Sequence, residues 1–137
     1  MKVLFIAGLL LLAAPFPRAQ SSPPPDLSDF TKSPNERTIQ QIEDPFRVRT
    51  IAGTISTATG EGGRADVLIE IQGPGDERTI RHALTDKHGH FKISKIPEGN
   101  YRFKATIFGF QSVTGTIIVS KHAPQMSEIK IEMQLGT

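Results

Sequence analysis

Hydrophobic and polar residues alternate in short runs from Val48 to Leu135. Because successive side chains of a strand point to opposite faces, this period of two predicts half-buried β-strands. Glycine-containing turns separate the runs, as is typical of two-sheet sandwiches. Seven strands are predicted, over residues 48–56, 66–72, 78–84, 90–94, 100–108, 114–120 and 127–135. We therefore expect an all-β, seven-stranded antiparallel Greek-key β-sandwich that occupies residues 48–135.

Two turns with defined chemistry are predicted between residues 85 and 100. Asp86 can accept hydrogen bonds from backbone N–H groups that follow it, and Gly89 can adopt the positive φ that closes a type I turn with a bulge. In the second turn Pro97 fixes φ, and Gly99 opens the exit. Both turns therefore have a structural explanation.

Four more residues complete this motif. Phe91 follows the first turn into the core, and Tyr101 begins the long strand, where its hydroxyl is expected to reach a backbone carbonyl as in a tyrosine corner. Gly109 bends the chain at the end of that strand, and Phe110 is expected to cap the core. None of these residues requires a catalytic role.

The first 19 residues have the pattern of a secretory signal peptide. Lys2 precedes an apolar run over residues 3–14, and the small residue Ala19 offers a cleavage position. The run is shorter than the ~18 residues that a membrane span needs. We therefore expect export to the periplasm or the outside, with no membrane span after cleavage.

Residues 20–47 are rich in proline, serine and charge, and their few apolar residues have no period. Such a segment buries too little apolar surface to offset its chain entropy. We expect a flexible tether here. A short helix over Glu36–Glu43 is the alternative, because Ser33 and Pro34 could start one.

Charge and cysteine content exclude several classes of protein. The chain has 16 Lys and Arg against 14 Asp and Glu, and two of the basic residues, Lys2 and Arg18, lie in the predicted signal. The remaining chain is neutral and has no basic cluster interleaved with aromatics, so we expect no nucleic-acid partner. The absence of cysteine excludes disulfides, thiolate metal sites and a cysteine nucleophile.

The candidate catalytic and metal-binding residues form no recognisable set. His82, His88 and His90 surround one hairpin, but their positions do not converge as metal ligands must, so neither metal nor cofactor is expected. His82 is expected to be half-buried. No spacing selects a pair of carboxylates for glycoside hydrolysis. The acidic residues considered are Asp66, Asp76, Asp86, Glu98 and Glu132. We therefore expect no enzyme.

A candidate ligand patch comprises His88, His90 and Phe108. Phe108 is out of phase with the buried residues of its strand and is therefore expected to be exposed. The glycine-rich loop over residues 60–64 could join it. Aromatic platforms on exposed loops are what sugar-binding sites use, although the chain has no tryptophan.

The series from Asp86 and Gly89 through Phe91 and Pro97 to Tyr101 and Phe110 resembles the carboxypeptidase regulatory-like domain. The resemblance implies a transthyretin-like (prealbumin-like) sandwich in the carbohydrate-binding-like fold group. It also implies an accessory module without catalytic activity. The C-terminal Tyr-Arg-Gly-Ser signature of transthyretin-like hydrolases is missing from the final residues, EMQLGT.

The sequence as a whole predicts an exported, non-catalytic β-sandwich module with a binding or assembly role in the bacterial cell envelope. Its partner would be an unknown protein or glycan. A carbohydrate-binding module that uses exposed loops is the alternative. We expect a monomer.

Overall fold

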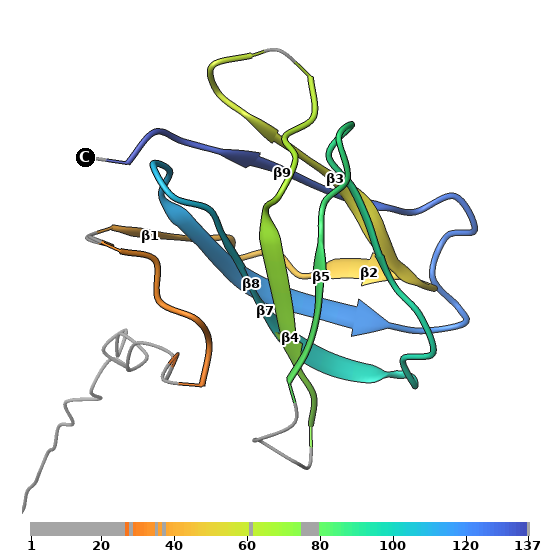
Figure 1. Ribbon diagram of the computed structural model, residues 1–137. Helices are drawn as coiled ribbons and strands as arrows, with labels where there is room; N and C mark the ends of the chain where they lie inside the picture. Colours follow the sequence, from red (N-terminus) through yellow and green to blue (C-terminus); the bar gives the residue numbers. More distant parts are fainter. Residues whose placement is uncertain are drawn as a thin grey trace, which may run out of the picture.

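The computed structural model describes residues 27, 29–34, 36, 38–60, 62–74 and 80–136. Two β-sheets pack face to face (Figure 1). The larger sheet contains β1 (Ile39–Gln41), β2 (Phe46–Val48), β4 (Leu68–Gln72), β5 (Ile80–Leu84), β7 (Gly99–Thr106) and β8 (Ser112–Val119). The smaller sheet contains β3 (Ile51–Thr57), β6 (His90–Ile93) and β9 (Ile129–Met133). The predicted signal peptide lies outside the described residues.

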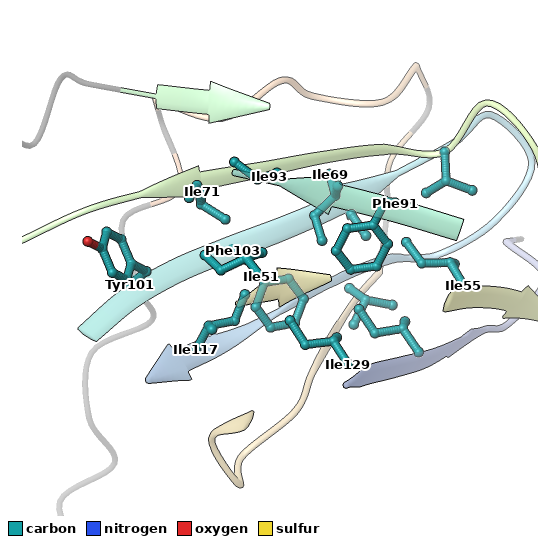
Figure 2. Packing of buried hydrophobic residues seen from close by; sticks show 14 of the residues in the cluster. Ile51, Ile55, Ile69, Ile71, Phe91, Ile93, Tyr101, Phe103, Ile117 and Ile129 are labelled. Carbon is teal, nitrogen blue, oxygen red and sulfur yellow. The ribbon is translucent and has the colours of Figure 1, made fainter. Parts of the chain in front are cut away.

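The core lies between the two sheets because each strand turns alternate side chains toward the other sheet. Along β7, Tyr101, Phe103 and Ala105 are buried in this way. Figure 2 shows Phe103 and Phe91 among isoleucines from both sheets. Burial of each such side chain stabilises the fold by roughly 1.5–3 kcal/mol. The period-two pattern of the sequence therefore identified the core.

All seven predicted strands are present, with ends that differ by at most three residues from those expected. The larger sheet has the order β1-β8-β7-β4-β5, with β2 also beside β8, and the smaller has the order β6-β3-β9. The sandwich is not entirely antiparallel, contrary to expectation. β9 runs parallel to β3, and β1 and β2 run parallel to β8. β9 follows a strand of the opposite sheet, so it joins β3 by a crossover and no hairpin fixes its direction.

Two strands lie in the segment that was expected to be a tether. β1 pairs with β8 through Gln40 and Val113, and β2 pairs with β8 through Arg47 and Ile118. Phe30 is buried. The expectation of a flexible tether over residues 20–47 is therefore wrong for the described part of that range. The alternative of a helix over Glu36–Glu43 is also wrong, because β1 occupies its centre.

Contacts between residues 29–36 and the outer face of the larger sheet fasten this segment; we call them the polar clasp. At its centre the Lys104 Nζ lies 3.0 Å from the Glu36 Oε1, and only 2% of the lysine side chain is exposed. Lys104 also donates to the Thr31 carbonyl at 2.9 Å. Ser112 donates a hydrogen bond to the Glu36 carboxylate. The buried charges thus have partners, as burial requires.

The clasp has a second carboxylate in Glu70, a buried residue of β4. The backbone N–H of Thr31 donates to one of its oxygens at 3.0 Å, and the Thr31 hydroxyl donates to the other at 3.1 Å. Next to it the Gln72 amide donates to Asp29 at 3.1 Å. Polar groups therefore hold the segment against the sheet. The prediction of disorder was based on the low hydrophobicity of the segment, and hydrophobicity does not reveal such polar contacts.

Candidate functional site

The turn between β5 and β6 is fixed by Asp86. Its carboxylate accepts the backbone N–H groups of His88 at 2.8 Å and His90 at 3.0 Å. The bonds from His90 and then His88 lower the pKa of Asp86 below its usual value. Gly89 has φ of 82°, and a Cβ there would lie 2.5 Å from the Ile55 carbonyl oxygen. The expected type of turn is present, and Asp86 is used to build it.

The second turn is fixed by Tyr101, whose hydroxyl donates to the Pro97 carbonyl at 2.6 Å. This is the hydrogen bond expected of a tyrosine corner. Burial raises the pKa of the Tyr101 hydroxyl. Phe91 is buried in the core, and Phe110 packs against the core from its edge. These residues therefore serve the scaffold.

Two exposed apolar side chains lie where the β7–β8 turn meets the residues after β9. Phe110 and Leu135 pair across an antiparallel bridge, and the N–H of Gln111 donates to the Gln134 carbonyl at 2.8 Å. Phe108, in the turn itself, is 69% exposed, and Leu135 is 55% exposed. The backbone contacts hold these two apolar side chains at the surface in a defined arrangement.

A cation from another loop joins this surface. The guanidinium carbon of Arg64 lies 5.4 Å from the centre of the Phe110 ring, within the range of a cation–π contact. The Arg64 backbone is held by a hydrogen bond of 2.8 Å to the Ile55 carbonyl. We call the surface formed by Arg64, Phe108, Phe110 and Leu135 the end patch.

Two residues of the expected patch of His88, His90 and Phe108 lie next to each other in the structure, namely the two histidines. The two histidine rings lie 6.3 Å apart. Phe108 lies in the β7–β8 turn, whereas His88 lies in the β5–β6 turn and His90 begins β6 of the smaller sheet.

The loop over residues 60–64 lies beside the histidine turn. A Cβ at Gly63 would come within 1.7 Å of the His88 carbonyl oxygen, so the two backbones are in close contact. This loop also carries Arg64 and therefore connects the histidine turn to the end patch. Sequence reasoning included the loop but missed Leu135, which it placed only within the last predicted strand, residues 127–135.

His82 is exposed, contrary to expectation. β5 is an outer strand of its sheet, and its pairing with β4 sets His82 opposite Glu70 on the outer face. Ala83 occupies the inward position opposite Ile69. Ile80, His82 and Leu84 thus share the face that points away from the core.

Three acidic residues that the sequence singled out lie on different elements within the described part of the chain. No group of three or more His, Asp or Glu residues there is placed to hold a metal ion. Glu98 accepts the Lys121 N–H at 2.6 Å, Asp86 is engaged in its turn, and Glu132 lies on β9. Asp76 lies outside the described residues.

No helix in the described ranges is long and apolar enough to cross a membrane.

Comparisons with known proteins address the family of the chain. No curated protein matches it. A solved structure of 3-chlorocatechol 1,2-dioxygenase from Rhodococcus opacus 1CP is similar over 73% of this chain and 68% of that one, with 12% sequence identity and a TM-score of 0.48. That likeness carries no argument about activity. The family model of the carboxypeptidase regulatory-like domain matches residues 50–134, more than half of the chain. The chain therefore belongs to the carboxypeptidase regulatory-like domain family.

Proposed function

We propose that this protein is an exported, non-catalytic module that binds a component of the bacterial cell envelope through its end patch. Export is supported by the signal-like pattern of the first 19 residues. A binding role is supported above all by one observation. Phe108 and Leu135 are large apolar side chains, well exposed, on a backbone held by cross-strand hydrogen bonds.

The side chains of the end patch are of the kinds that bind partners at protein surfaces. Exposed apolar groups gathered at one place, with polar groups around them, mark interaction surfaces. Aromatic and arginine side chains contribute most to binding energy at such surfaces. Because Arg64 already lies over Phe110, its side chain loses less freedom when a partner covers it. We therefore favour a protein partner with an apolar side chain to place beside Phe108.

A carbohydrate ligand is the second candidate. The observation in its favour is the exposed ring of Phe108, because aromatic faces pack against sugar rings. A glycan array with the purified chain separates the two candidates. Saturable binding to a glycan that is lost in the variant Phe108→Ala would favour the carbohydrate.

The main proposal is tested by capture from a solubilised envelope fraction on the immobilised chain, followed by affinity measurement with the captured component. We expect Phe108→Ala to weaken binding by about tenfold or more, equivalent to ~1.4 kcal/mol. Leu84→Ala is the matched control, since Leu84 is 59% exposed but lies on β5, outside the end patch. Equal loss in both variants, or no loss in either, would contradict a role for the end patch.

A further inference from the structure

The free edge of β9 offers a second surface, separate from the end patch. β9 is the outer strand of the smaller sheet, and β3 is its one strand partner in the described part of the chain (Figure 1). Ile129, Ile131 and Met133 are buried beneath the sheet, whereas Lys130 and Glu132 are exposed. An outer strand presents unpaired backbone N–H and C=O groups to any strand that can align with it.

Two hydrogen bonds show which residues of β9 face that edge. The N–H of Ala58, just after β3, donates to the Met133 carbonyl at 2.9 Å, so Met133 faces β3. The Gln134 carbonyl accepts from Gln111 instead, on the other side. Because successive residues of a strand direct their backbone groups to opposite sides, Lys130 and Glu132 also point to the free edge.

We propose that two copies of this chain pair through this edge, with their β9 strands antiparallel and Ile131 opposite Ile131 of the second copy. A two-fold axis then relates the copies, and the contact is self-complementary. Lys130 of each copy stands opposite Glu132 of the other. Both pairs are of the hydrogen-bonded kind, since the backbone groups of both residues face the partner.

The charges select this register over its neighbours. A shift of the second strand by two residues in one direction sets Lys130 opposite Lys130, and the same shift in the other direction sets Glu132 opposite Glu132. Like charges directly opposite each other destabilise a strand pair, whereas opposite charges stabilise it. Lys130 is available for a new partner, because its side chain is 78% exposed and its contact with Glu128 is a loose 3.8 Å.

The contact is short, which predicts a weak dimer. Gln111 already occupies the edge at Gln134, so the ladder ends after Glu132. Its area should fall below the roughly 1,200 Å² of standard stable interfaces. Self-association would then appear at high local concentration, in contrast to the monomer expected from the sequence. This inference does not depend on the end patch, and Phe108→Ala should leave the dimer unchanged.

A charge swap tests the proposal by sedimentation velocity across a concentration series. We expect Lys130→Glu alone and Glu132→Lys alone each to raise the dimer dissociation constant by about tenfold, and the double variant to restore it. Lys92→Glu on β6, the opposite outer strand of the same sheet, is the control and should change nothing. If the single variants associate like the original chain, or if the double variant does not recover, the register is wrong.

Cysteine cross-linking tests the register directly, since the natural chain has no cysteine. Opposite residues of a hydrogen-bonded pair have Cα atoms about 5.5 Å apart, within reach of a disulfide. A mixture of the Lys130→Cys and Glu132→Cys variants should form a disulfide-linked dimer under mild oxidation faster than either variant alone. Equal rates in the mixture and in the separate variants would overturn the proposed pairing.

Discussion

The Glu36 carboxylate lies 3.0 Å from the Lys104 ammonium, and this pair joins the N-terminal segment to a strand 68 residues further along the chain. Lys104 also stands opposite Glu70 in the pairing of β7 with β4. Release of the segment would therefore leave Lys104 with an opposite charge beside it on a solvated face. The segment contributes its own docking energy, while the sandwich beneath it can remain folded.

Removal of one partner of this ion pair should release the segment. We expect Glu36→Gln to weaken docking by about 3 kcal/mol, because it removes the carboxylate charge that lies 3.0 Å from the buried Lys104 ammonium when the segment is docked. Hydrogen exchange of the Ile42 amide, which donates to the Thr114 carbonyl at 2.8 Å, measures docking. Exchange there should accelerate by roughly 100-fold while β7 amides stay protected. Glu128→Gln, in the exposed pair with Lys130, is the control and should have almost no effect.

Acid should release the same segment. Burial alone would raise the pKa of Glu36, but hydrogen bonds from Ser112 and Lys104, with the charge of Lys104, outweigh it, so its pKa lies below the usual 4.5. A lowered carboxyl pKa gives stability that is complete above 4.5 and is lost as pH falls through the folded value. Protection of the Ile42 amide should therefore decline in that acid range. In Glu36→Gln this decline should be absent; an unchanged pH dependence would assign it to another group.

The Tyr101 hydroxyl should contribute measurably to stability. Tyr101→Phe keeps the buried ring but leaves the Pro97 carbonyl without its donor, which should cost about 1 kcal/mol in urea unfolding. Since burial raises the pKa of Tyr101, its contribution is complete below the ordinary value of 10.0 and is lost as pH rises through the folded value. The difference between the two proteins should therefore shrink in strong alkali. A difference that persists unchanged there would argue against a titrating Tyr101.

Gly89 and Gly109 allow positive φ to be compared with and without crowding. Gly109→Ala should cost about 1 kcal/mol, since φ is 93° and no atom lies within 4 Å of the added Cβ. Gly89→Ala should cost more, because the added Cβ would lie 2.5 Å from the Ile55 carbonyl oxygen and the backbone would have to move. Denaturant midpoints measure both. Equal losses of stability in the two variants would mean that the turn at Gly89 accommodates the added Cβ at no cost.

The strands and turns could be predicted because their signals are local. Alternation along residues 100–108 identifies the buried face of β7, and the spacing of Asp86 and Gly89 identifies their turn. The position of the N-terminal segment could not be predicted in this way. Its contacts join Thr31 to Glu70 and Glu36 to Lys104, pairs of polar residues far apart in the sequence that follow no period.

The candidate site could likewise be predicted only in part, namely where a residue has a local signal in the sequence. Exposure of Phe108 was expected from its phase in the strand, and it is observed. Its neighbours depend on the order of strands and on where the chain runs after β9, and neither leaves a local mark in the sequence. For that reason the bridge between Leu135 and Phe110, two residues after Phe108, could not be predicted.

Chemical-shift mapping with a captured envelope component tests the central claim most directly. The isotopically labelled chain is titrated with the purified component, and perturbed amides are placed on the structure. Binding through the end patch predicts the largest shifts at Arg64, in the β7–β8 turn at residues 107–111, and at Leu135, with none along β6 or along the polar clasp. Shifts concentrated on another face, with the end patch unperturbed, would contradict the proposed function.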